Sequence, residues 1–148
     1  MIIRVNSRHT AGFSLIELMA TVAIVAILTM IAIPAYNAYV IRANRAFATN
    51  ALQMTSQALQ RCYSLNFTFV NSSSTPCTVT SGTTPTPDGY YSIQVQVPQA
   101  NSFTLTATPL KAPQTNDSQC ASFTLSSSGQ QSAQTTQATD NSLACWGS

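Results

Sequence analysis

The chain has 148 residues, which is enough for one domain with a modest core. Only 7% of its residues are charged, compared with about 25% in an average soluble domain. So small a fraction of charged residues indicates that part of the chain lies in lipid or against neighbouring subunits. The net charge of +2 excludes a broadly basic surface for nucleic acid.

Residues 1–12 are polar and basic, with Arg4 and Arg8 placed as in the start of a signal sequence. The apolar run that follows has no A-x-A-like cleavage site after it, and Gly12 stands directly before it. If cleavage follows Gly12, residues 1–12 are a leader peptide and the apolar run stays on the mature protein.

The apolar run begins at Phe13, and from Leu18 to Ile41 it contains no charged residue. These 24 residues would span about 36 Å as a helix, against a hydrocarbon core about 30 Å thick. Residues 13–41 are therefore predicted to form a membrane-spanning helix, and the arginines of the leader predict a cytoplasmic N-terminus.

The helical pattern continues beyond Pro34 with a more polar surface. Five residues recur at helical spacing and would form one face: Phe47, Ala51, Met54, Ala58 and Cys62. Arg45 and the neighbouring Asn and Gln residues lie off that face. We therefore expect one helix from Phe13 to about Leu65, whose amphipathic half, 42–65, turns this face towards a sheet.

The remaining residues, 66–148, are rich in Ser, Thr, Gln and Pro, and in three segments apolar and polar residues alternate. The segments are Tyr91–Val97, Phe103–Ala107 and Ala121–Leu125. This alternation predicts half-buried strands of a small antiparallel sheet. Residues 66–89 are expected to form a loop, Pro98 and Pro109 to end the first two strands, and Ser126–Gly129 to turn the chain. The predicted fold class is α+β, with the long helix packed on the sheet.

Four cysteines lie in the C-terminal two-thirds of the chain: Cys62, Cys77, Cys120 and Cys145. None has the spacing of a metal site, so we expect disulfides and an oxidising compartment. Of the three possible pairings we expect Cys62–Cys77, which would staple the loop after the helix, and Cys120–Cys145, which would tie down the polar tail from Gly129 to Ser142. The alternatives would link the helix end to the sheet or to the tail, and they remain open.

The junction Gly12-Phe-Ser-Leu-Ile-Glu17-Leu, followed by an apolar helix with Pro34, resembles the class III leader junction of type IV pilins and related pseudopilins. Later segments are similar to PilE-type minor pilins: Phe103–Pro109, Cys120–Leu125 with Gly129, and the closing Cys145-Trp146. The resemblance implies the pilin fold and cleavage by a prepilin peptidase between Gly12 and Phe13. It also implies N-methylation of Phe13 and a kink of the helix at Pro34.

Glu17 is a charged residue near the start of the apolar helix. In a filament core without water its carboxylate would have to be protonated or paired. The nearest cation after cleavage is the terminal amine of Phe13, which stays chargeable when methylated. A bond between the Glu17 carboxylate of one subunit and the Phe13 amine of a neighbour would neutralise both and fix their axial register, so we assign Glu17 to assembly.

The residue combinations typical of nucleophilic catalysis are missing from the predicted mature chain. The sole histidine, His9, lies in the leader, which leaves no Ser/His or Cys/His arrangement. The remaining glycines form no phosphate-binding loop. We expect no catalytic residues, no cofactor and no metal site.

The sequence therefore predicts a structural subunit of a type IV pilus, most like a minor pilin needed for pilus assembly and for its functions in motility and adhesion. Its expected partners are other pilin subunits, the prepilin peptidase and methyltransferase, and the inner-membrane pilus assembly machinery. The protein would cross the inner membrane once before assembly and would then reach the cell surface in the pilus.

A DNA-uptake receptor pilin is one alternative. Phosphate contacts dominate affinity for DNA, so this function needs a positive surface. The region after residue 65 instead carries a net charge of −2, from Lys111, Asp88, Asp117 and Asp140. This charge argues against nucleic acid as a partner. A type II secretion pseudopilin is a second alternative, and the expected disulfides with the Cys145-Trp146 ending favour the pilus instead.

Overall fold

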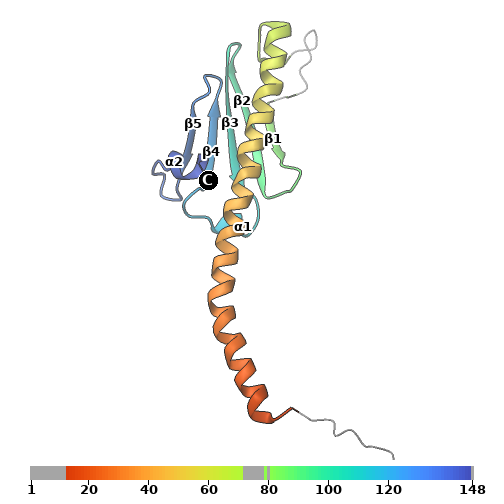
Figure 1. Cartoon of the computed structure of the whole chain (residues 1–148). Helices are drawn as coiled ribbons and strands as arrows, with labels where there is room; N and C mark the ends of the chain where they lie inside the picture. Colours follow the sequence, from red (N-terminus) through yellow and green to blue (C-terminus); the bar gives the residue numbers. More distant parts are fainter. Residues whose placement is uncertain (1–12, 72–78, 80, 148) are drawn as a thin grey trace, which may run out of the picture. The chain divides into compact units, whose positions relative to one another are not determined.

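The computed structural model describes residues 13–71, 79 and 81–147, shown in Figure 1. The elements are α1 (Leu15–Asn66), β1 (Gly82–Pro85), β2 (Tyr91–Gln99), β3 (Ser102–Pro109), a 3₁₀ turn (Gln114–Asn116), β4 (Ser122–Ser126), β5 (Gln131–Gln134) and α2 (Ser142–Trp146). The chain divides into two compact units, and the first ends at Tyr36. The second begins at Asn37 and is called the head below.

Helix α1 runs unbroken from Leu15 to Asn66, so the prediction of one long helix is confirmed. It contains no glycine, and most of its residues are good helix formers. It ends where Phe67 takes a positive φ of 55°. The Phe67 amide donates to the Tyr63 carbonyl at 2.7 Å, which satisfies one of the carbonyls left open at the helix end.

The head contains a five-stranded antiparallel sheet in the order β1-β2-β3-β4-β5. The three strands predicted from alternation are its centre, β2, β3 and β4. Their inward residues face one another across the strands: Ile93 pairs with Ala107, and Leu105 pairs with Leu125. These four side chains are buried, as the alternation predicted.

The prediction that Pro98 ends its strand was wrong, because β2 continues to Gln99. The pairing of β2 with β3 shifts register between Gln96 and Gln99, so Pro98 lies where the ladder is already irregular. A proline has no amide hydrogen to donate, and it is tolerated at such a bulge. Pro109 is the last residue of β3, as expected.

Two strands and a short helix were not predicted. Strand β1 was placed in the loop 66–89, and its four residues are all exposed, so its sequence carries no alternation. Strand β5 was placed in the tail, and Ala133 is its one buried residue. Both are edge strands, each pairing with a single neighbour through its backbone. Helix α2 packs beside β5 at the end of the chain (Figure 1).

The face of α1 that packs on the sheet was predicted only in part, because Cys62 is buried and Ala51 packs against the core but other predicted residues are exposed. Phe47 and Met54, placed on the buried face, are 50% and 69% exposed. The buried apolar residues of α1 in the head are Ala48, Leu52, Leu59 and Cys62. Apart from Cys62, which belongs to both stripes, the buried stripe lies one residue further along α1 than the predicted one, which corresponds to a turn of the helix by about 100°. Buried polar residues on the true face hide its periodicity in the sequence: Asn44, Arg45 and Ser56.

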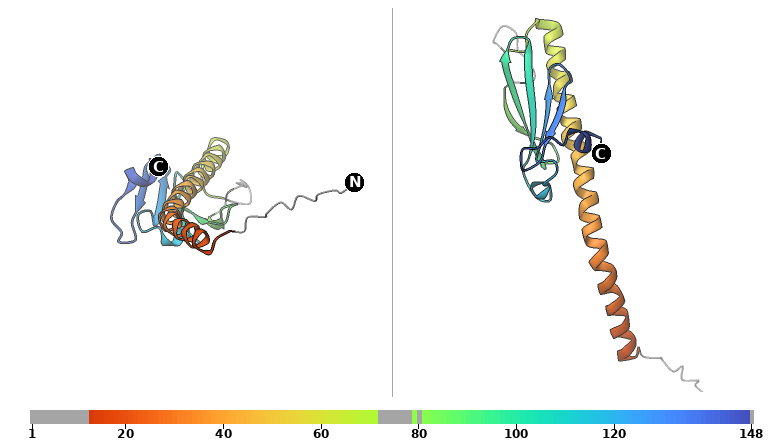
Figure 2. Two further views of the ribbon diagram at one scale, coloured as in Figure 1. Left: turned by 60° about the horizontal axis from the view of Figure 1, so that its bottom comes forward. Right: turned by 90° about the vertical axis from the view of Figure 1, so that its left-hand side faces the viewer.

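The core of the head lies between the sheet and the second half of α1, and Figure 2 shows the sheet on one side of this helix. Two clusters of aromatic side chains fill the two ends of this core. Phe69 stacks on Tyr63 and meets Phe103 edge-on, with ring centroids 4.6 and 4.9 Å apart. At the other end Phe123 meets Tyr91 and Trp146 edge-on. The indole nitrogen of Trp146 donates to the Ser132 carbonyl of β5 at 2.9 Å, which holds α2 against the edge strand.

Candidate functional site

Residues 13–36, which precede the head, are called the anchor segment here. Every side chain in this segment is exposed, and most are large and apolar. Helix α1, which contains most of the segment, is long and apolar enough to cross a membrane by length and composition. An apolar surface of this extent is stable only in lipid or against neighbouring subunits.

The polar side chains of the anchor segment are largely satisfied within the helix. The Thr21 hydroxyl donates to the Leu18 carbonyl at 2.8 Å, and the Thr29 hydroxyl donates to the carbonyls of Val25 and Ala26 at 3.0 Å. Such bonds to the preceding turn let threonine enter an apolar environment without losing its hydrogen bonds. The two threonines are therefore compatible with lipid on all sides.

Glu17 is the one charged residue between Phe13 and Ile41. It lies in the first turn of α1, where the partial positive charge of a helix N-terminus favours a carboxylate. Phe13 precedes the helix and is 85% exposed. Gly12 lies outside the described residues. Pro34 lies inside α1, which continues through it.

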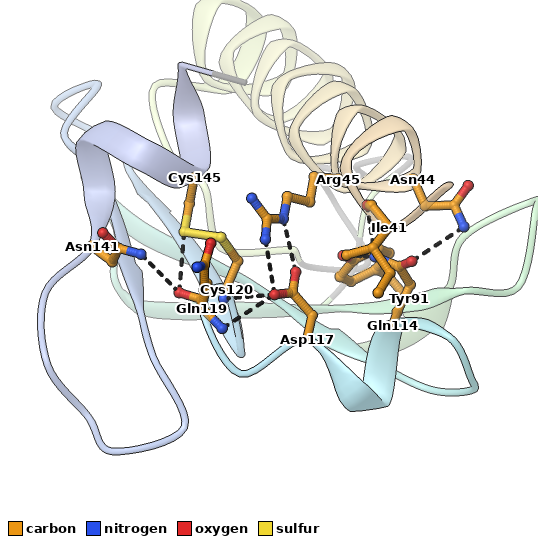
Figure 3. Close-up of polar contacts among 10 residues, drawn as sticks. All are labelled: Ile41, Asn44, Arg45, Tyr91, Gln114, Asp117, Gln119, Cys120, Asn141 and Cys145. Atoms are coloured by element: carbon orange, nitrogen blue, oxygen red, sulfur yellow. Dashed lines mark hydrogen bonds and ion pairs between the residues drawn. A yellow bond between two sulfur atoms is a disulfide. The ribbon is translucent and has the colours of Figure 1, made fainter. Parts of the chain in front are cut away.

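A polar network joins α1 to the loop between β3 and β4, and it is called the clamp here (Figure 3). The Arg45 guanidinium contacts both carboxylate oxygens of Asp117, at 2.7 and 2.8 Å. Both side chains are buried. One Asp117 oxygen also accepts the backbone amides of Gln119 and Cys120, at 3.1 and 3.3 Å. The carboxylate is thus fully bonded, and the loop is held to the helix by charge and by hydrogen bonds.

Gln114 is the second buried residue of the loop that reaches α1. Its side-chain amide nitrogen donates to the Tyr91 hydroxyl at 2.7 Å and to the Ile41 carbonyl at 3.2 Å. Its amide oxygen accepts from the Asn44 side chain at 3.2 Å. Burial raises the pKa of the Tyr91 hydroxyl above its ordinary value, although the bond from Gln114 acts in the opposite direction.

A disulfide joins Cys120 to Cys145, the pairing that we expected for these two residues. It links the end of the clamp loop to α2. The Asn141 side chain, next to α2, donates to the Gln119 carbonyl at 3.2 Å and strengthens the same link. Cys62 is also disulfide-bonded. Cys77, its expected partner, lies outside the described residues.

Sequence reasoning missed the clamp and placed Arg45 on an outer face of the helix. A usable signal exists, because Arg45 precedes Ala48 and Leu52 by three and seven residues and so shares their face. Its partner, Asp117, is 72 residues away, and nothing local in the sequence connects the two. Among the described residues, no group of three or more His, Cys, Asp or Glu side chains could hold a metal ion.

Two family models match the sequence. A model of the prokaryotic N-terminal methylation motif matches residues 7–33, which include the Gly12-Phe13 junction. A model described as type IV minor pilin ComP, DNA uptake sequence receptor, matches residues 34–124, which is more than half of the chain. The chain belongs to this family of type IV minor pilins. No curated protein matches the sequence.

The pilin is therefore a structural subunit of a type IV pilus. Its methylation motif and its exposed anchor segment are those of a protein that first sits in the inner membrane and is then assembled into a surface pilus. Other pilins are its partners in the filament, and the methylation motif indicates processing by a prepilin peptidase.

Proposed function

We propose that this pilin is cleaved between Gly12 and Phe13, is N-methylated at Phe13, and enters the pilus through a bond between Glu17 and a neighbour's Phe13 amine. Its role is structural and not catalytic, and it supports pilus assembly, adhesion and motility. Its partners are other pilins, the prepilin peptidase and methyltransferase, and the inner-membrane assembly machinery.

One observation carries the proposal, which is the single charge of an otherwise apolar and fully exposed anchor segment. Neighbouring subunits that cover this surface also remove water from Glu17. A carboxylate without water or a partner is costly, so packing selects an arrangement that supplies a cation. Phe13 lies four residues before Glu17, and cleavage would give it a terminal amine.

The test compares the pilin in sheared pili and in membranes, by mass spectrometry and by immunoblot. We expect a mature N-terminus at methylated Phe13. Glu17→Ala and Glu17→Gln should be inserted and cleaved as in the wild type, but both should be depleted from pili about tenfold or more, because both lose the charge. Thr21→Ala, one turn further along α1, is the matched control and should assemble normally. An intact Met1, or wild-type amounts of either Glu17 variant in pili, would contradict the proposal.

Binding of DNA is the second candidate, because the description of the matching family names a DNA uptake sequence receptor. The cations of the head offer it little support. Arg45 is buried with Asp117, and the Lys111 ammonium lies 4.5 Å from the Tyr90 ring centroid and 3.3 Å from the Asp88 carbonyl oxygen. Arg42 and Arg61 are exposed on α1, a surface that neighbouring helices would compete for.

The second candidate is tested with the full chain in detergent and a fluorescent DNA duplex. We expect a dissociation constant no tighter than the non-specific range of about 10⁻⁴ to 10⁻⁶ M at physiological salt, with no preference among sequences. Lys111→Gln should change it little. Tight, sequence-dependent binding that Lys111→Gln weakens would establish the receptor function instead.

A further inference from the structure

A cleft of about 380 Å³ lies between α1 and the clamp loop, at the start of the head. The helix contributes Ala38, Ile41 and the two arginines of its next turn. The loop contributes polar side chains from three exposed residues: Asn116, Ser118 and Gln119. The side chains of these three residues are two amides and a hydroxyl, and each can donate a hydrogen bond.

The cleft carries one uncompensated positive charge. Arg45 and Asp117, both in its wall, neutralise each other through two short bonds. Arg42 is exposed, and its guanidinium forms no ion pair or hydrogen bond with any residue that the structure describes. A planar guanidinium with adjacent neutral donors suits an oxyanion such as phosphate, which it can bind through two parallel bonds.

In the sequence, the helix residues of the cleft directly follow most of the segment that was predicted to span the membrane. Arg42 directly follows the uncharged residues from Leu18 to Ile41, whose helix is about 36 Å long against a hydrocarbon core of about 30 Å. Tyr36 and Tyr39 precede it and are exposed. Exposed tyrosines followed by arginine are typical of the headgroup layer, where aromatic rings and cations anchor a spanning helix.

We propose that this cleft binds the phosphate of a phospholipid headgroup while the pilin is in the inner membrane. Arg42 supplies the charge, the Asn116 and Gln119 amides and the Ser118 hydroxyl supply neutral donors, and the lipid tails stay in the bilayer. The clamp keeps the loop donors opposite Arg42. The cleft does not include Phe13 or Glu17. The proposal of lipid binding and the proposed assembly function can therefore be refuted independently of each other.

The experiment uses the full chain, with ¹⁵N-labelled side chains, in dodecyl maltoside micelles. Three probes are added in turn: phosphatidylglycerol, a monoglucosyl-diacylglycerol with the same acyl chains and no phosphate, and inorganic phosphate. We expect phosphatidylglycerol to shift the NMR signals of the Arg42 Nε and of the Asn116 and Gln119 side-chain amides, in a saturable way. The glucolipid should shift none of them, and inorganic phosphate should do so only at far higher concentration.

Two variants give a matched comparison of arginines. Arg42→Gln should weaken the apparent affinity for phosphatidylglycerol about tenfold or more, because a charge-assisted bond is lost. Arg61→Gln removes an equally exposed arginine further along α1 and should leave the affinity unchanged. Both should give an unaltered spectrum elsewhere, since neither arginine has a charged partner among the described residues.

Three results would overturn the proposal. Equal shifts with the glucolipid would mean that acyl chains and not phosphate cause them. Equal weakening by Arg61→Gln would mean that the interaction is only general charge attraction. Saturation by inorganic phosphate at the same concentration as by phosphatidylglycerol would assign the cleft to free anions in place of a lipid.

Discussion

Arg45 and Asp117 form a charged pair whose side chains are almost fully buried in the head. Removing both charges from water is expensive, and the attraction between them commonly does little more than offset that cost. The pair is better understood as a positional device, because the Asp117 carboxylate also binds two amides of its own loop. It sets which part of the loop faces α1.

Tyr91 gives this network a measurable pH dependence. Its pKa is raised in the folded protein, mainly by burial, so the folded state holds the hydroxyl proton more tightly than the unfolded state. Below the ordinary value of about 10 both states are protonated and the contribution to stability is complete. As the pH rises from there through the raised folded value, the unfolded state loses its proton first, and the free energy of unfolding falls.

We therefore expect Tyr91→Phe to flatten the alkaline decline in the free energy of unfolding. At neutral pH it should cost about 0.5–1.5 kcal/mol, because Gln114 loses one acceptor and keeps the Ile41 carbonyl. The measurement is denaturant unfolding of the full chain in detergent, followed by the fluorescence of Trp146. Tyr90→Phe, whose hydroxyl makes no bond with a described residue, should leave neutral stability unchanged. An alkaline slope identical in Tyr91→Phe and the wild type would show that the burial of this hydroxyl has no such effect.

The secondary-structure elements differ in how well they can be predicted from the sequence. Helix α1 was predictable because no glycine interrupts it, and the central strands were predictable because apolar and polar residues alternate in each of their sequences. Strands β1 and β5 were not, because an edge strand held by its backbone needs few buried side chains. The orientation of α1 was ambiguous, since two adjacent stripes are both largely apolar and only packing on the sheet selects one.

The residues of the candidate site also differ in how well they can be predicted from the sequence. Phe13, Glu17 and Pro34 belong to a local motif, so the sequence alone could propose them. The clamp depends on residues about 70 positions apart, and its polar members fall within an otherwise apolar face. An argument from apolar periodicity assigns polar residues to the surface. A charged side chain can, however, also be buried if it is paired with an opposite charge.

Two apolar surfaces of the molecule stay exposed among the residues that the structure describes. One is the anchor segment. The other lies on α1 in the head, where Phe47 and Met54 are exposed, lie seven residues apart and share a face. Burial of such side chains contributes about 1.5–3 kcal/mol each, which is available only if another subunit packs there. Both surfaces are suited to contacts between helices in a filament.

Substitution of this second surface should therefore affect assembly and leave the fold intact. Phe47→Ser and Met54→Ser should change the free energy of unfolding by less than about 0.5 kcal/mol, because both side chains are exposed. The double variant should be depleted from sheared pili about tenfold or more relative to the membrane fraction, since more than about 1.4 kcal/mol of contact energy is lost. Leu110→Ser is the control, because Leu110 is 51% exposed, close to the 50% of Phe47, and follows β3 instead of lying on α1. Immunoblots of the two fractions measure the ratio. If the Leu110 variant were depleted equally, or the double variant assembled at the wild-type level, the exposed face of α1 in the head would not be a filament contact.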